Sequence, residues 1–85
     1  MVAPSRAAVH QGCLDDPQKA LEAAFAITTR SLVSEVEQVF VDCAARTGIS
    51  SVTAINDAHA FIATGAVSGY VLQCCSAKLA SKVNA

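Results

Sequence analysis

The sequence has no tryptophan, one tyrosine and three phenylalanines among its 85 residues. Alanine and other small residues carry much of the hydrophobic content, which favours closely packed helices over a β sandwich. The opening stretch MVAPSRAAVHQG lacks a continuous apolar segment, so we do not expect it to act as a secretory signal as it stands. Its small, polar residues predict a flexible arm over residues 1–12, followed by a single domain over residues 13–85.

Charge is also scarce. Charged residues make up 15% of the chain, against about 25% in an average protein. The net charge is −1, and no lysine or arginine lies between Thr47 and Ala77. Neither nucleic acid nor an acidic membrane surface is therefore an expected partner. The hydrophobic share of 53% is high for so small a domain, and we expect some apolar surface to face a partner, a ligand or lipid.

The motifs of common active sites are missing as well. There is no glycine-rich phosphate loop, no G-x-S-x-G, no suggestive carboxylate pair and no C-x₂-C. His10 near Cys13 is the nearest approach to a metal site, and His59 opposite Cys43 the nearest to an activated thiol. We expect neither to act as one, and we predict no enzyme activity, no catalytic residue, no metal and no cofactor.

The first half of the domain predicts an amphipathic helix. Asp15 or Asp16 can cap its start, with Pro17 in the first turn, and Gly48 stands where a left-handed cap would end it. Apolar residues recur between them at helical spacing. The run TTRS, residues 28–31, is the point at which this helix can break into two.

The second half predicts a connector over residues 49–57 and then a helix to about residue 80. Apolar residues lie nearly all round this helix, which is typical of a helix buried among others. The expected architecture is all-α, either a helical hairpin or a small three-helix domain.

Two glycines four residues apart, Gly65 and Gly69, interrupt the second helix. Each glycine costs roughly 1 kcal/mol relative to alanine in a helix interior, so a compensating close contact is expected. The predicted helix-contact face comprises Phe61, Gly65, Val67, Gly69 and Leu72. The alternative is a turn at residues 65–69. A membrane span over residues 58–75 is not expected, because polar residues interrupt it and leucine is sparse.

Four cysteines are compatible with disulfide bonds and favour an oxidising compartment, secreted or lumenal. A Cys13–Cys43 bond would force a strained bond between Cys74 and Cys75 and is ranked last. In a simple hairpin Cys74 lies far from Cys43, so Cys13 is expected to bond with Cys74 or Cys75. Cys43 is then predicted to be a buried free thiol.

Two short stretches resemble DNA-associated families. CAARTGISSVTAINDA, residues 43–58, resembles a helix-turn-helix core, with Gly48-Ile49-Ser50 at the turn and Thr53 after it. VTAINDAHAFIATG is similar to the loop and last helix of histone folds. Both families bind DNA through basic side chains, which this region lacks, so nucleic acid remains an unexpected partner.

The favoured function is that of a small structural or interaction protein, which packs a small-residue helix face against a protein partner or a second copy. A disulfide-tied helical module that binds a hydrophobic small molecule or lipid is the alternative. A DNA-associated module comes third.

Overall fold

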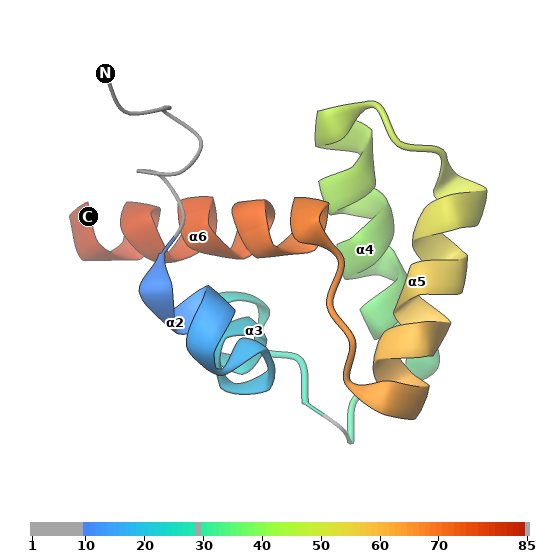
Figure 1. The fold of residues 1–85 in the computed structure, drawn as a ribbon, viewed down its shortest axis with the longest axis horizontal. Helices are drawn as coiled ribbons and strands as arrows, with labels where there is room; N and C mark the ends of the chain where they lie inside the picture. The colour runs from blue at the N-terminus through green and yellow to red at the C-terminus, as the bar shows by residue number, and fades with distance from the viewer. Residues whose placement is uncertain (1–9, 29, 85) are drawn as a thin grey trace.

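The computed structural model describes residues 10–28 and 30–84, which form helices and no strand. α4 and α5 run side by side in opposite directions, while α6 packs on α4, α3 and α2 (Figure 1). The all-α prediction is confirmed. The helices in chain order are α2 (Gln11–Asp15), α3 (Pro17–Phe25), α4 (Val33–Thr47), α5 (Ser51–Thr64) and α6 (Gly69–Asn84).

Several predicted helix ends are present. The Asp16 side chain accepts the backbone N–H of Lys19, and Pro17 occupies the first turn of α3. Gly48 ends α4 with a left-handed φ of 76°. The expected N-terminal arm lies outside the described residues up to position 9, and residues 10–12 belong to the start of α2 rather than to an arm.

The predicted long first helix breaks between residues 26 and 32. Ala26 adopts a left-handed φ of 60° and ends α3. Beyond it, the Thr28 N–H donates to the Ser31 hydroxyl, and the Arg30 N–H donates to the Thr28 hydroxyl. The Thr28 and Ser31 side chains thus take backbone partners of their own in the break that Ala26 begins.

The connector predicted over residues 49–57 is much shorter in the structure. The Ser50 hydroxyl accepts the N–H of Thr53 and starts α5 at Ser51. Ile49 and Ser50 are therefore the only residues between the αL cap at Gly48 and the next helix. A connection this short holds α4 and α5 together as an antiparallel pair.

The stretch GAVSG is a turn, so the prediction of one continuous second helix is wrong. Gly65 has a left-handed φ of 80° and caps α5, and α6 begins at Gly69. Across this break Ser51–Thr64 and Gly69–Lys82 are bent by 83°. Within the described ranges, no single helix is long and apolar enough to span a membrane.

The core is centred on Phe40, which is fully buried. The centroid of its ring lies 5.8 Å from that of Phe61 and 6.4 Å from that of Tyr70, whose ring it meets edge to face. Phe40 thereby joins α4 to both α5 and α6, and such aromatic pairs add to the stability gained by burial. The other large, fully buried aliphatic side chains are Leu21, Val36 and Val71.

Replacing Ala26, the left-handed residue that ends α3, by glycine should stabilise the fold. Because Ala26 is exposed and strained at φ 60°, Ala26→Gly should raise the free energy of unfolding by about 0.5–1 kcal/mol. The matched control is Ala60→Gly, at an exposed position inside α5, which should lower it by about 1 kcal/mol. Chemical denaturation measures both, and a loss of stability in Ala26→Gly would contradict the assigned cap.

Tyr70, the only tyrosine in the sequence, should make the stability of the fold depend on pH. Burial raises the pKa of Tyr70 to about 12, helped by its hydrogen bond to the carboxylate of Asp57, whereas a hydrogen bond with Ser68 opposes the rise. The phenol donates to Asp57 Oδ2 over 2.7 Å. An unfolded tyrosine ionises near pH 10, so the stability contributed by protonated Tyr70 is complete below pH 10 and is lost between about pH 10 and 12.

Ultraviolet titration of the folded protein should therefore place the phenolate midpoint near pH 12. In Asp57→Asn the midpoint should fall, yet stay above 10, because the burial remains. A wild-type midpoint at 10 would show that the phenol is neither buried nor bonded to Asp57.

Candidate functional site

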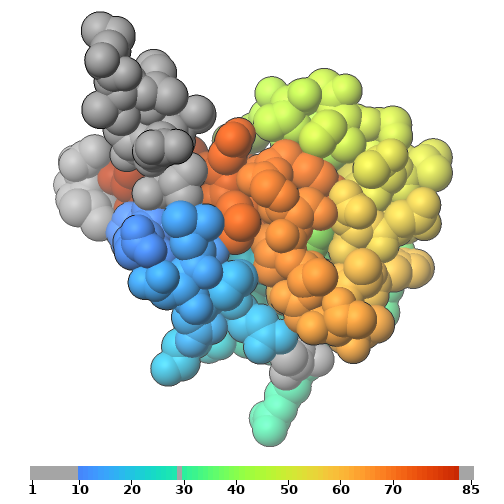
Figure 2. Space-filling model, viewed as in Figure 1, coloured from blue at the N-terminus to red at the C-terminus, as the bar shows by residue number. Residues whose placement is uncertain are grey.

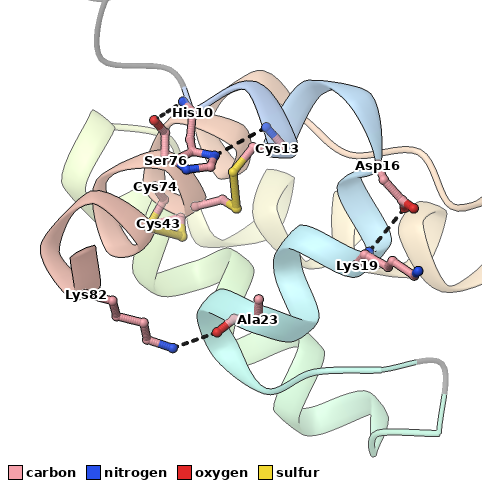
Figure 3. Close-up of a disulfide and its surroundings, with 11 residues drawn as sticks. His10, Cys13, Asp16, Lys19, Ala23, Cys43, Cys74, Ser76 and Lys82 are labelled. Atoms are coloured by element: carbon pink, nitrogen blue, oxygen red, sulfur yellow. Dashed lines mark hydrogen bonds between the residues drawn. A yellow bond between two sulfur atoms is a disulfide. The ribbon is translucent and has the colours of Figure 1, made fainter.

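Two disulfide bonds tie α6 to separate parts of the fold. Cys75 is bonded to Cys13 of α2, and the adjacent Cys74 is bonded to Cys43 of α4 (Figure 3). Successive side chains on a helix point about 100° apart, which lets neighbouring cysteines reach two different helices. The bonds join residues 62 and 31 positions apart. Each is expected to stabilise the fold by about 2–5 kcal/mol.

Cys13 is therefore bonded to one of its two predicted partners, but the predicted free thiol at Cys43 is wrong. Cys43 is buried, at 1% exposure, yet it is bonded to Cys74. No cysteine of the described residues is free. The expectation assumed that the second helix continues straight past residue 65. The turn there brings α6 back across α4, so Cys74 comes within reach of Cys43.

Polar contacts near the disulfides hold α6 at two further points. The His10 N–H donates to the hydroxyl of buried Ser76, beside Cys75. The Lys82 ammonium donates to the carbonyl of Ala23 over 2.6 Å (Figure 3). That carbonyl is in the last turn of α3, where a positive charge also suits the helix dipole.

The predicted helix-contact face is not a single surface. Gly65 and Gly69 stand on either side of the turn between α5 and α6. Phe61 is buried in the core, while Val67 and Leu72 are half-buried against it. These residues pack within the domain and lie on two helices and the turn between them, so the prediction that they form one helix face for a partner is wrong.

Four of the six exposed large apolar side chains, Val33, Val52, Ile55 and Ile62, lie on α4 and on a face of α5 next to its buried one, whereas Leu14 and Leu32 lie elsewhere. Val52 is 71% exposed and Ile62 is 47% exposed, whereas Ala54, Ala58 and Phe61 on the inner side are buried. In the view of Figure 2, α5 lies at the edge of the molecule and no other helix covers it. We call this surface the α4–α5 groove: Val33, His59 and Ile62 line its concave part, Glu37 of α4 contacts His59, and Val52 and Ile55 continue it along α5.

The groove contains a histidine–glutamate contact beside its apolar residues. His59 Nε2 lies 2.6 Å from Glu37 Oε2, with side chains 57% and 30% exposed. Val33 and Ile62 lie beside this pair and, with His59, line a concavity of about 260 Å³. A polar contact this exposed adds little stability. Its effect is to place one acidic and one imidazole group in an otherwise apolar surface.

A second concavity of about 290 Å³ lies between α3 and α5. Its floor includes Phe61 and Ile27, and its rim carries Asp16, Lys19 and Glu22. Hydrophobic ligands usually occupy clefts of about 300–1,000 Å³ with mainly apolar walls. The charged rim makes this crevice a poor match for such a ligand.

The two weak candidate sites of the sequence, His59 with Cys43 for catalysis and His10 with Cys13 for a metal, are not formed in the described residues. His59 pairs with Glu37 rather than Cys43, whose sulfur is in a disulfide. His10 Nδ1 accepts the N–H of Gly12, and nearby Cys13 is also in a disulfide. Over residues 10–28 and 30–84, no three histidine, cysteine, aspartate or glutamate side chains are grouped to hold a metal.

Comparison of the chain with protein-family models, with curated proteins and with solved structures gives no match. The surface features of the chain are therefore the only guide to its function. The signal of the groove in the sequence is the spacing of Val52, Ile55, His59 and Ile62, which places all four on one helix face. Because Ala54, Ala58 and Phe61 form a second apolar face, the pattern looked apolar all round and predicted complete burial.

The disulfides should differ in their sensitivity to reductant. Cys74 is partly exposed, whereas Cys13 and Cys75 have no exposed surface. Thiol–disulfide exchange requires access to a sulfur, so mild reduction of the folded protein should open Cys43–Cys74 first. Alkylation followed by peptide mapping measures the order. In guanidinium the difference should vanish, and earlier labelling of Cys13 and Cys75 in the folded protein would contradict it.

Proposed function

We propose that this protein is a small interaction protein whose α4–α5 groove binds a protein partner. The observation that supports this most directly is the exposure of large apolar side chains on both helices of the hairpin. Val33, Val52 and Ile62 are each between about half and three-quarters exposed. Exposed apolar residues gathered on one surface are typical of a protein interface, whereas single ones are ordinary.

The charge distribution supports a binding surface of this kind. Outside the Glu37–His59 pair, the groove side of α5 carries no charged residue. Interface cores are depleted in charged residues and polar at the rim. A helix that served only as the outer wall of a soluble domain would normally have charged residues on its exposed side.

The rest of the domain holds this surface rigid. Cys43–Cys74 fixes α4 to α6, and Phe40 packs on Phe61 from the inner side of α5. A preorganised surface loses little conformational entropy when a partner binds. The two disulfides also favour an oxidising compartment for the proposed interaction.

The other function classes have less support. The crevice between α3 and α5 has a charged rim, which disfavours a hydrophobic small molecule. α4 and α5 run antiparallel side by side (Figure 1), whereas the helices of a DNA-binding helix-turn-helix cross at about 90–120°. The absence of lysine and arginine from residues 48–76 also disfavours DNA. We assign no enzyme activity.

Site-specific photo-crosslinking tests the proposal. A photoreactive residue replaces Ile62 in the groove or, as the matched control, Leu14 of α2, which is 51% exposed and outside the groove. The full chain is expressed in the organism that makes it. We expect a discrete protein adduct from position 62 and none from position 14.

The partner identified in the adduct must then bind the purified wild type and lose at least tenfold affinity for Ile62→Glu. Equal adducts from positions 62 and 14 would refute the groove as the binding surface. Lipid adducts at position 62, without protein, would refute the proposal in favour of the lipid-binding alternative.

A further inference from the structure

We infer that the Cys43–Cys74 disulfide is a thiol-exchange site, at which an anionic low-molecular-weight thiol of the glutathione class attaches reversibly to Cys74. The site lies where α6 covers α4, so it does not depend on the groove or on the proposed function. Two observations support it: the unequal exposure of the four cysteines, and the basic residues beside this bond.

The four bonded cysteines differ in their access to solvent. Cys13 and Cys75 have no exposed surface, and Cys43 is 1% exposed. Cys74 is partly exposed and packs against the core from its edge. The rate of thiol–disulfide exchange depends on which sulfur an incoming thiolate can reach. In the folded protein an external thiolate is therefore expected to attack Cys74.

The charged residues one helical turn from this bond are both basic. Side chains three and four positions apart on a helix are neighbours. Arg46 follows Cys43 by three residues, and Lys78 follows Cys74 by four. At such spacings from these two cysteines, no other residue of α4 or α6 is charged. Both basic side chains are exposed, and neither has an ion pair within the part of the chain that the structure describes.

The helix dipole accounts for only one of these charges. Arg46 is in the last turn of α4, where a positive charge is favourable in any helix. Lys78 lies inside α6, away from both of its ends, so the dipole does not explain it. Asp42 is adjacent to Cys43, but its side chain points about 100° away around α4 and accepts a hydrogen bond from Gln38.

The other disulfide has a different charge environment. Asp16 follows Cys13 by three residues, so an acidic residue lies one helical turn from the buried Cys13–Cys75 bond. An anionic thiol is repelled by this carboxylate, and it also lacks access to either sulfur. Access and charge thus favour the same bond, Cys43–Cys74.

The positive charges determine which kind of thiol reacts fastest. Cations near a cysteine stabilise thiolates, and they raise the local concentration of anions until salt screens them. Glutathione has more carboxylate than ammonium groups, whereas 2-mercaptoethanol has no charge besides that of its thiolate. Arg46 and Lys78 should therefore accelerate attack by glutathione more than attack by 2-mercaptoethanol.

The exchange step balances without a net oxidation. The thiolate sulfur of glutathione attacks Cys74 Sγ, and a new disulfide forms between them. The Cys43–Cys74 bond breaks, and its electron pair leaves on Cys43 Sγ, which then takes a proton from water. In the reverse step the Cys43 thiolate attacks Cys74 Sγ and expels glutathione.

The remaining contacts of α6 make the exchange reversible. Cys75 stays bonded to Cys13, while Tyr70 keeps its contact with Phe40. These contacts hold Cys74 near the freed Cys43. The adduct should therefore form in excess thiol and disappear when the thiol is withdrawn, with the fold retained.

Timed exchange of the folded, oxidised chain with glutathione or with 2-mercaptoethanol tests the inference. Acid quenching, alkylation in guanidinium and peptide mapping locate the products. We expect glutathione on Cys74, a free thiol at Cys43 and an intact Cys13–Cys75 bond. The readout is the rate constant for glutathione divided by that for 2-mercaptoethanol, each per thiolate. A change in access alters both constants, so their ratio reports charge.

Substitution of the basic residues should change this ratio. Lys78→Gln should lower it about twofold, and adding Arg46→Gln should lower it further. The matched control is Lys19→Gln, at an exposed position on α3 away from the Cys43–Cys74 bond (Figure 3), which should leave the ratio unchanged. Circular dichroism and intact mass confirm that each variant is folded and has both disulfides.

Two further measurements do not depend on these variants. Raising the ionic strength from about 10 mM to about 0.5 M should lower the wild-type ratio, because salt screens the two cations. Cys43→Ser lacks the returning thiol, so its Cys74 thiolate should attack oxidised glutathione, expel one glutathione thiolate and keep the other as a lasting adduct.

First attack at Cys13 or Cys75, or an adduct on Cys43, overturns the assignment of Cys74. A wild-type ratio that salt leaves unchanged, or equal ratios in Lys78→Gln and Lys19→Gln, overturns the preference for an anionic thiol. A Cys43→Ser chain that is folded but takes no glutathione overturns the site itself. Photo-crosslinking at position 62 tests a different surface, so the proposed function stands or fails separately.

Discussion

The bonding of two adjacent cysteines to two different helices is the constraint on which the rest of the structure depends. Cys74 and Cys75 fix α6 to α4 and to α2, from neighbouring positions on one helix. A domain of this size buries a modest core, so the two cross-links are expected to add substantially to its stability. With α6 fixed, Val71 enters the core and Tyr70 contacts Phe40, so the covalent and hydrophobic contacts support the same arrangement.

This placement of α6 determines which surface is left for a partner. α6 covers α4 on the side that contains Cys43, and Phe40 of α4 reaches Phe61 on the inner side of α5. The core is then complete, although α5 still has apolar residues on its other side. Val52 and Ile62 remain exposed for this reason. The groove thus follows from a helix with two apolar faces in a domain that covers only one of them.

Local signals predicted much of the fold because they act within a few residues. Asp16 with Pro17, and Gly48 with its left-handed φ, begin and end helices as their backbone preferences require. Ser50 is also a local cap, but the capping residues that follow it, Ser51, Asn56 and Asp57, give the same signal and extend the predicted connector to residue 57. Gly65 has two readings in the sequence, because a glycine serves equally as a helix-contact position and as a left-handed cap. Its neighbours within the helix do not distinguish the two.

By itself, the sequence determined the all-α class, the main helix caps and the bonding of Cys13 to one member of the adjacent cysteine pair. Only the tertiary structure decided that Cys43 is bonded, that GAVSG is a turn, and which face of α5 is exposed. The physical reason is that these outcomes depend on the direction in which α6 leaves Gly65. A bend of 83° at one turn moves Cys74 from a remote position to Cys43, and periodicity along a helix contains no information about that angle.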